Sequence, residues 1–268
     1  MKILQLSDLH YRSQYLPATN AYQEMLTKME NPLIYLDLAI EKAKSMTAID
    51  LVLITGDLTE DGEVCDYRFL REYFIRQFPT TPVMVTLGNH DIKENFYQGW
   101  LKNVPTSNYY NFICEMADFY LFSFDSSIYG NADGFIDKNQ LNWLEEMLAT
   151  HQDKPVLFMT HHHLIQGQYA TANLPQSDQL WQVLKRHNIL AVLNGHTHCH
   201  YQATIGEIPY YTVDGLSFLG QDEGGGLVRF VQHAGFSLYE IKAGQFQEIA
   251  TEIVTSGKLL QKVDMRLC

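Results

Sequence analysis

Three histidines stand close together in the stretch LNGHTHCH, residues 193–200, where an apolar run of the sequence ends. They are His196, His198 and His200. Imidazole is the most common metal-ligating side chain and also titrates near neutral pH, so such a cluster indicates a metal site or a catalytic base, unless the side chains have no function. The choice depends on whether metal-binding residues also follow other apolar runs.

Metal-binding or acid–base side chains do follow four earlier apolar runs. They lie in the segments SDLH at 7–10, GD at 56–57, GNHD at 88–91 and HHH at 161–163. A single motif of this kind is more typical of a turn or a cap than of a metal site. The carboxyl ends of strands line the ligand crevice of an α/β sheet, however, so five such groups at successive strand ends predict one shared metal site.

The types of side chain favour a pair of divalent transition metal ions. Asp8 and His10 are two residues apart, so an extended backbone points both toward one ion. The carboxylate oxygens of Asp57 can bridge ions about 3.5 to 4 Å apart, and Asn89 adds a neutral oxygen. Imidazoles, carboxylates and an amide without thiolate suit manganese, iron, zinc or cobalt better than calcium or copper(I).

Such a site is matched to a phosphoester. Two divalent ions, two carboxylates and a bridging hydroxide leave a net charge of about +1 in a partly buried cleft, and a phosphodiester carries a single negative charge. The same ions lower the pKa of bound water from about 15.7 to about 7, which supplies hydroxide at neutral pH. The residues therefore predict hydrolysis of a phosphoester.

Buried strands must position these groups. Short apolar, β-branched runs are typical of such strands, and they fall at 2–6, 50–55, 82–87, 120–124, 155–160, 189–194, 208–213, 226–231 and 236–241. The β-α-β-α-β order early in the chain and the strand-rich later part predict an α/β (α+β) fold. We expect a four-layer αββα sandwich of two mixed β-sheets flanked by helices, with the dinuclear metal site at the strand C-terminal ends.

Four helical patterns lie between the strands. The first begins at the Asn31-Pro32 cap, ends near Met46 and repeats Ile34, Leu38 and Ala39 at helical spacing. The others cover 64–78, 140–151 and 177–187, and a cap at Ser177 begins the last of them.

Length and composition suit one domain over residues 1–268, because 46% of the 268 residues are hydrophobic. No apolar stretch is as long as a membrane-spanning helix, and the N-terminal apolar segment is too short for a signal peptide. The four cysteines are scattered, as reduced thiols are. We therefore expect a cytoplasmic protein. Its net charge of −12 disfavours nucleic acid polymers and anionic membranes as partners.

The ordered set D-x-H, G-D, G-N-H-D, histidine cluster and G-H-x-H resembles the calcineurin-like metallophosphoesterases over roughly residues 1–200. SDLH, ITGDLTEDG, NGHTH, FDSS at 124–127 and QLNWLEEML at 140–148 are most similar to the bacterial class III cyclic-nucleotide phosphodiesterases and related glycerophosphodiesterases. The resemblance implies a metal-dependent phosphodiesterase that hydrolyses a small phosphodiester, with a 3′,5′-cyclic nucleotide as the first candidate.

The resemblance also implies roles for individual residues. It implies two ligand sets that share one carboxylate: Asp8, His10, Asp57 and His198 for one ion, and Asp57, Asn89, His161 and His196 for the other. Asp57 and His90 are the catalytic candidates. Metal-bound hydroxide would attack phosphorus, and His90 would contact the phosphate and protonate the leaving alkoxide.

The histidine cluster departs from the family pattern, which usually has prolines after a histidine pair. THHHLIQG has three histidines and no proline. His161, directly at the strand end, is the preferred ligand, and His162 is the alternative ligand and a candidate substrate contact. His163 faces the cleft or is structural, and His200 is expected beside the ligands rather than among them.

Two inserts, near 11–30 and 93–112, are expected to shape the pocket. Arg12, Asn89, His90 and His162 are the candidate substrate contacts. Aromatic residues of the inserts either stack on a nucleobase or pack in the core or a dimer contact: Tyr11, Tyr15, Phe96, Tyr97, Trp100, Tyr109 and Tyr110. The loop 166–176 is expected to form a mobile lip.

Several alternatives stay open. Asp91 is expected to orient His90 or a ligand, and His151, His187 and His233 are expected at the surface. The tail 258–268 either packs on a partner subunit, in a homodimer, or folds back as an edge element.

Alternative substrates are a glycerophosphodiester, a phospholipid headgroup, a nucleotide monoester or a phosphoprotein. A non-catalytic binding scaffold is the remaining alternative function.

Overall fold

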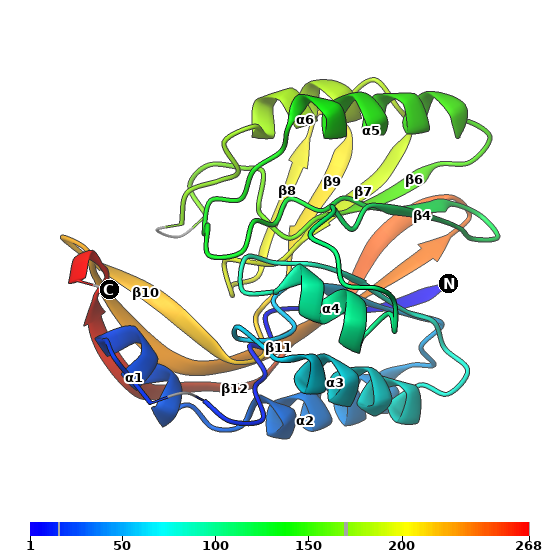
Figure 1. Cartoon of the computed structure of the whole chain (residues 1–268). Coiled ribbons are helices and arrows are strands. Elements are labelled where there is room, and N and C mark those ends of the chain that lie inside the picture. Colours follow the sequence, from blue (N-terminus) through cyan, green and yellow to red (C-terminus); the bar gives the residue numbers. More distant parts are fainter. Residues whose placement is uncertain (16, 169–170, 268) are drawn as a thin grey trace.

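Two β-sheets pack face to face, and helices cover the outer side of each (Figure 1). This computed structural model describes residues 1–15, 17–168 and 171–267. Both sheets have six strands and are mixed. The buried side chains between them include Leu53 of the first sheet and Leu157 and Leu193 of the second. The predicted four-layer αββα sandwich is confirmed.

The first sheet contains the strands that precede SDLH, GD and GNHD. Its central strands β1, β2 and β3 are parallel, and β11 runs antiparallel to β1. In spatial order the strands are β10 (Phe218–Gly224), β11 (Leu227–Lys242), β1 (Lys2–Leu6), β2 (Leu51–Thr55) and β3 (Val83–Thr86), with β12 (Gln245–Asp264) also paired to β11.

The second sheet contains the strands that precede HHH and GHTH. Its strands β5, β6, β7 and β9 are parallel to one another, and the two edge strands are antiparallel. In spatial order they are β4 (Phe112–Glu115), β5 (Tyr120–Ser123), β6 (Val156–Met159), β7 (Ile189–Asn194), β9 (Ile208–Thr212) and β8 (Tyr201–Ile205).

Helices cover both sheets where the sequence predicts them. The outer layers are formed by α2 (Pro32–Met46) and α3 (Val64–Gln77) on the first sheet, and by α5 (Lys138–Thr150) and α6 (Ser177–Leu184) on the second (Figure 1). Asn31 accepts a hydrogen bond from Leu33 N at 3.0 Å, which caps α2. Ser177, predicted to be the N-cap of α6, is its first residue, and Gln176 is the N-cap. The helix ends at Leu184 rather than near His187.

The apolar face of α2 differs from the predicted one. Its buried side chains are Pro32, Tyr35, Leu36, Ala39, Ile40 and Ala43. Ile34 is 50% exposed and Leu38 is 45% exposed. The pair at 34 and 38 follows helical spacing, but the broader stripe centred on Leu36 and Ala39 faces the sheet because it buries more apolar surface.

A long hairpin extends beyond the sandwich. The runs 226–231 and 236–241 are one strand, β11, and β12 pairs along it. The distal part of the hairpin, with β10, packs against α1 (Ala21–Lys28) around Met25, Phe230 and Val263 (Figure 1, left). The short helices α4 (Lys93–Gly99) and η1 (Met265–Leu267) complete the fold. The C-terminal tail therefore folds back as an edge strand.

His233 lies in the middle of β11 and is buried, so its predicted surface position is wrong. Its Nε2 is 2.8 Å from Asp214 Oδ1, and its Nδ1 is 3.1 Å from Ser256 Oγ. These partners satisfy both ring nitrogens, which is why an imidazole is tolerated inside the strand.

None of the described helices combines the length and the apolar composition that a bilayer crossing requires.

Candidate metal centre

The loops after β1, β2, β6 and β7 bring the predicted donors together between the two sheets. Within each of three groups the ligand atoms lie within 4.8 Å of one another: Asp8, His10 and His198; Asp8, Asp57 and His161; and His161, His162 and His196. All of these side chains except His196 are buried. The convergence that strand order predicts is therefore present in the fold.

Strained backbone holds several of these side chains. The φ angles of Asp8, His10, Asp57, His196 and His198 are positive, between 46° and 73°. Non-glycine residues rarely adopt this left-handed region, and each such residue costs roughly 1 kcal/mol or more. The strain is concentrated at the strand ends, where it turns the donors toward one another.

The imidazole rings of His10 and His198 face each other through their Nε2 atoms. Their Nε2 atoms are 3.1 Å apart. His10 Nδ1 is 2.5 Å from Glu60 Oε2, and His198 Nδ1 is 2.7 Å from the carbonyl oxygen of Phe218. With the protons on Nδ1, two lone pairs point at each other, and Asp8 Oδ1 lies 3.4 Å from His198 Nε2. This arrangement is unfavourable alone and fits a cation between the donors.

Asp57 lies between the two halves of the centre. Its Oδ2 is 3.6 Å from His10 Nε2 and 3.3 Å from His161 Nε2. The opposite nitrogen of His161, Nδ1, donates to the carbonyl oxygen of Thr55 at 2.7 Å. Burial raises the pKa of Asp57, but the nearby His161, His90 and His10 outweigh it and hold the pKa well below its usual range. Asp57 is thus an ionised carboxylate that reaches both halves.

Buried polar atoms without a hydrogen-bond partner also gather here. Among the described residues they include Asn89 Oδ1 and the Nε2 atoms of His161, His162 and His196. An unpaired buried polar atom costs about 1–3 kcal/mol, so such a concentration needs an explanation. Oxygen and imidazole donors aimed into one space fit divalent transition metal ions, and the residues present therefore suit the implied group.

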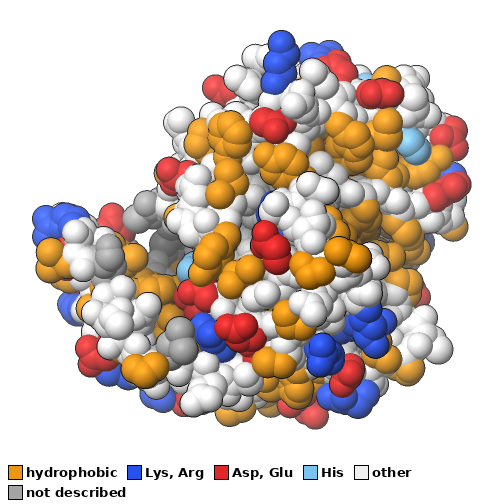
Figure 2. All heavy atoms as spheres, in the orientation of Figure 1, with side chains coloured by type: hydrophobic (Ala, Val, Ile, Leu, Met, Phe, Trp, Pro, Cys, Tyr) orange, Lys and Arg blue, Asp and Glu red, His pale blue; other side chains and the backbone are white. Residues whose placement is uncertain are grey.

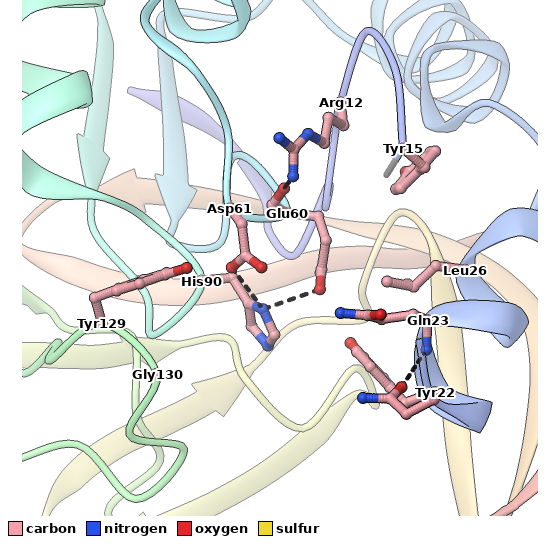
Figure 3. Close-up of a pocket in the computed structure, with 11 residues that line it drawn as sticks. Arg12, Tyr15, Tyr22, Gln23, Leu26, Glu60, Asp61, His90, Tyr129 and Gly130 are labelled. Carbon is pink, nitrogen blue, oxygen red and sulfur yellow. Dashed lines mark hydrogen bonds and ion pairs between the residues drawn. The ribbon is translucent and has the colours of Figure 1, made fainter. Parts of the chain in front are cut away.

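Glu60 and His90 form an acid–base pair beside the donors (Figure 3). His90 Nδ1 lies 3.2 Å from Glu60 Oε1 and 3.8 Å from Asp61 Oδ1, and its side chain is 26% exposed. Burial lowers the pKa of His90, but Glu60, Asp57 and Asp61 raise it well above its usual range. The sequence analysis missed Glu60, although this acid lies three residues after Asp57 in the quoted ITGDLTEDG.

Asp91 accepts hydrogen bonds from the loops after β2 and β3. Its Oδ2 accepts hydrogen bonds from Gly88 N at 3.0 Å and Leu58 N at 3.2 Å, and its Oδ1 accepts one from Tyr67 Oη at 3.0 Å. The contacts of Asp91 with the described residues do not include His90, so of the two expected roles they fit the orientation of ligands. Asp91 instead connects the loop after β2 with the loop after β3, which carry Asp57 and Asn89.

A small cavity of about 270 Å³ lies beside His90. Arg12 lines it, with Nη1 3.5 Å from the carbonyl oxygen of Glu60 and Nη2 3.8 Å from Glu63 Oε1. Tyr15, Asp61 and Tyr22 line other parts of it (Figure 3). The expected insert 11–30 therefore contributes to this cavity.

A larger cleft of about 590 Å³ lies over the donors. His10, Asn89 and His90 are among the polar residues that line it, and its apolar wall contains Tyr22, Phe218, Val228, Phe230 and Met265. Phe218 adjoins the donors, because its ring centroid is 5.0 Å from that of His10. Figure 2 shows the molecule hollowed between the hairpin at the left and the main body. The sequence analysis did not single out the aromatic residues of β10 and β11, because their role arises only when the hairpin folds over the centre.

Other predicted residues lie away from the cleft. Phe96 and Trp100 of the insert 93–112 are buried in the core under the first sheet, where Tyr97 and Tyr110 also pack. His200 contacts Glu248, with 2.8 Å between Nε2 and Oε1, and is outside the donor groups. Thr171 and Ala172 of the expected lip line the cleft, but Tyr169 and Ala170 lie outside the described residues.

A family model described as calcineurin-like phosphoesterase matches residues 1–200. The chain belongs to this family. It is 26% identical over 210 residues to a Xenorhabdus bovienii protein named "Probable cyclic nucleotide phosphodiesterase", covering 74% of this chain and 78% of that one. It is 32% identical over 166 residues to a cAMP/cGMP dual specificity phosphodiesterase of Mycobacterium tuberculosis, covering 60% and 52%.

Solved structures support the same fold for this calcineurin-like phosphoesterase. A dimetal phosphatase from Danio rerio aligns with a TM-score of 0.54 at 12% identity, over 93% of this chain and 98% of that one. At this identity the likeness concerns the fold alone. The family and the phosphodiesterase-named relatives make the chain a metallophosphoesterase with residues placed to bind metal ions.

Proposed function

We propose that this metallophosphoesterase hydrolyses a small phosphodiester, with a 3′,5′-cyclic nucleotide as the first candidate. The proposal depends chiefly on the donor atoms on both sides of Asp57, next to His90 at the surface of the cleft. Relatives 26% and 32% identical to the chain carry cyclic nucleotide phosphodiesterase names, which supports the substrate class.

Two divalent ions would be held by the shared carboxylate and the surrounding donors. One ligand set is Asp8, His10, Asp57 and His198, and the other is Asp57, Asn89, His161 and His196. Bound there, such ions supply an acidified water and polarise phosphoryl oxygens. Manganese, iron, zinc and cobalt all suit a mixture of imidazole, carboxylate and amide donors.

His90 is proposed to contact the phosphate and to protonate the leaving alkoxide. Glu60 accepts the hydrogen bond of Nδ1, so the second proton is held at Nε2, in a ring that lines the cleft. The carboxylates of Glu60 and Asp61 stabilise the protonated ring until the transfer. Asn89 would bind a phosphoryl oxygen through its amide nitrogen, and Arg12 would contact a more distant part of the substrate.

The lining of the cleft favours a diester over a monoester. Among the described residues that line it there is no lysine or arginine, and Asp133 and Asp222 are acidic. Protonated His90 is then the cationic side chain nearest the phosphate, so the second charge of a dianionic monoester would be compensated less well than the single charge of a diester. The apolar wall at Phe218 and Phe230 suits a neutral organic group such as a nucleoside.

Metal-reconstituted protein tests the proposal. The apo protein is loaded in turn with manganese, iron, zinc and cobalt and assayed with bis(p-nitrophenyl) phosphate, cyclic AMP and p-nitrophenyl phosphate. We expect metal-dependent turnover of both diesters and slower turnover of the monoester. Absence of diesterase activity with every metal would refute the proposal, and faster turnover of glycerophosphodiesters or the monoester would change the substrate class.

We propose that residues 1–268 act as one domain, with the 11–30 insert and the β10–β12 hairpin shaping the pocket. The insert 93–112, which was also expected to shape it, contributes none of the described residues that line the two cavities. A small-molecule substrate fits the net charge of −12 better than a nucleic acid polymer or an anionic membrane. A cytoplasmic location also remains part of the proposal. Sedimentation analysis would separate a monomer from the homodimer that the sequence leaves open.

A further inference from the structure

Arg12 is a buried cation with poor partners. Its side chain is only 9% exposed, and it lines the small cavity beside His90. Its Nη1 is 3.5 Å from the carbonyl oxygen of Glu60, and its Nη2 is 3.8 Å from the exposed carboxylate of Glu63. The first distance is at the limit of a hydrogen bond, and the second contact contributes little because water screens Glu63. The guanidinium therefore offers N–H groups and a positive charge to an occupant of the cavity.

Asp61 supplies the opposite charge to the same cavity. Its carboxylate is 3.8 Å from His90 Nδ1, which lies closer to Glu60, at 3.2 Å. Glu60 also lines the cavity, but its two oxygens already contact the rings of His10 and His90. The two described residues Arg12 and Asp61 form no ion pair with each other. The cavity thus contains a cation and a carboxylate that do not neutralise each other.

Neutral polar groups accompany these charges (Figure 3). Gln23 Oε1 accepts hydrogen bonds from Thr19 N at 2.8 Å and from Thr19 Oγ1 at 2.7 Å. The amide nitrogen of Gln23 points the other way, toward His90, and has no hydrogen-bond partner among the described residues. The Tyr129 hydroxyl lies on the side of Asp61. An occupant therefore meets a free donor in addition to the two charges.

His90 places this cavity beside the alcohol that leaves in the proposed reaction. The ring lines both the small cavity and the larger cleft, as Tyr22 and Gly130 also do. His90 is proposed to protonate the leaving alcohol, so that alcohol lies against the ring, and the small cavity is open to it. A 3′,5′-cyclic nucleotide has both ester oxygens on one sugar and leaves the small cavity unfilled. An acyclic diester with two separate substituents fills the cleft and the cavity together.

We propose that the small cavity binds the leaving alcohol of an acyclic phosphodiester, and that this alcohol is a zwitterionic amino alcohol such as serine. This second substrate class rests on the proposed two-metal function. Arg12 and Gln23 bind the carboxylate of the alcohol, and Asp61 binds its ammonium group. Ethanolamine would leave Arg12 without a partner, and glycerol would leave both charges without one. The zwitterion alone compensates both, which is the physical basis of the preference.

The reaction adds one water molecule to the diester. The water oxygen forms a bond to phosphorus, the bond from phosphorus to the amino-alcohol oxygen breaks, and His90 donates its proton to that oxygen. The proton that the water loses passes to solvent, from which His90 is protonated again. The products are the free amino alcohol and a phosphomonoester that keeps the other substituent.

Phosphonate analogues test the inference without turnover. In the analogues of phosphoserine, phosphoethanolamine and ethyl phosphate, a methylene group replaces the ester oxygen, so the three ligands are not hydrolysed and carry both charges, the ammonium group alone or neither. Calorimetric titration of the zinc-loaded parent should give a Kd about 10- to 100-fold lower for the serine analogue than for the ethanolamine analogue. Arg12→Gln should bind these two analogues about equally. Arg186→Gln, a control at an exposed arginine of the second sheet's outer side, should keep the preference.

Equal affinity of the parent for the three analogues would overturn the inference and leave the proposed function standing. A preference for serine that persists in Arg12→Gln would also overturn it. A crystal structure of the zinc-loaded parent with the serine analogue does not depend on a variant folding. A carboxylate oxygen within about 3.2 Å of an Arg12 nitrogen supports the inference, and an amino-acid group bound in the larger cleft excludes it. If none of the analogues binds and the loaded parent hydrolyses no diester, the proposed function fails together with the inference.

Discussion

Glu60 connects the candidate metal centre to the candidate acid. One of its oxygens lies 2.5 Å from His10 Nδ1, and the other lies 3.2 Å from His90 Nδ1. Burial raises the pKa of Glu60, but His90 and His10 outweigh burial and lower it to about 2. The carboxylate therefore stays ionised and fixes the orientation of both rings, so that a single side chain influences ion binding and proton donation.

Replacing His90 with alanine tests its role as the proton donor. We expect kcat with cyclic AMP to fall about 10²- to 10⁴-fold, because its leaving alkoxide requires a proton. The loss with bis(p-nitrophenyl) phosphate should be smaller, because p-nitrophenolate leaves without one. Steady-state kinetics with both substrates measure the difference, and His187→Ala is the control. Equal losses with the two substrates would argue against proton donation by His90.

The change Glu60→Gln tests the outer support of His10. A neutral amide holds the Nδ1 proton of His10 less strongly, so we expect the affinity for one of the two ions to fall about 10- to 100-fold. Equilibrium dialysis with zinc or cobalt measures the affinity. Glu72→Gln, an exposed position on α3, should bind metal as the parent does. Parent-like metal affinity in Glu60→Gln would remove Glu60 from the centre.

At the scale of elements, the β11–β12 hairpin contributes both to the sandwich and to the cleft. One end of β11 pairs with β1 inside the sandwich, and the other end pairs with β10 and carries the apolar wall of the cleft. There the ring centroid of Tyr22, from α1, is 6.3 Å from that of Phe218 and 5.8 Å from that of Phe230. The helix α1 therefore completes a wall that the hairpin begins.

Removing the Tyr22 ring tests this wall. Aromatic contacts with a base are worth about 1–3 kcal/mol, so Tyr22→Ala should raise KM for cyclic AMP roughly 5- to 100-fold while kcat changes little. Tyr22→Phe keeps the ring and should resemble the parent. Separate determination of KM and kcat distinguishes lost binding from lost chemistry. If Tyr22→Ala leaves KM unchanged, the base does not contact this wall.

The elements that the sequence predicted well are those with local signals. Asn31 and Pro32 mark the start of α2 within two residues, and apolar runs mark the strands of the sandwich. The middle of β11 contains His233 and Gly235, which interrupt the apolar pattern, and the partner of His233 lies at Asp214. Contacts so distant in the chain leave no local pattern, and β12 is a largely polar edge strand that gives little signal.

The candidate site shows the same limit. Motif spacing identified the side chains at the strand ends, because parallel strands deliver them to one place. Glu60 and the apolar wall were missed, since their roles depend on ring-nitrogen distances and on how the hairpin folds. The sequence also could not separate His161, His162 and His163, because neighbouring histidines differ only in the direction of their rings.

At the scale of the whole molecule, the candidate ions would join the two sheets. Asp8, His10 and Asp57 follow strands of the first sheet, whereas His161 and His196 follow strands of the second. Ions shared between these sets would hold both sheets together at one end of the sandwich. A bound cation would also remove the repulsion between the Nε2 lone pairs of neutral His10 and His198 rings.

Removal of metal should therefore lower the thermal stability of the whole domain. A ligand at 100 times its Kd contributes about 2.7 kcal/mol per site, or about 5.4 kcal/mol for two ions. This predicts a fall in Tm of roughly 10–20 °C for a domain of this size on chelation. Calorimetry before chelation, after it and after reloading measures the change. Asp57→Asn, which weakens both ligand sets, should show a smaller difference. Identical melting with and without metal would contradict bound ions that join the sheets.

The register of β12 against β11 shifts at Phe230/Val231, Val231/His233, Ala234/Gly235 and Leu238/Tyr239. Each bulge places an extra residue in one strand, bends that strand and increases its twist, which re-aims the side chains beyond it. None of the proposed ion-binding residues lies on the β11–β12 hairpin. A change in the position of a bulge would therefore redirect the side chains of the hairpin over the cleft and leave the ion-binding residues in place.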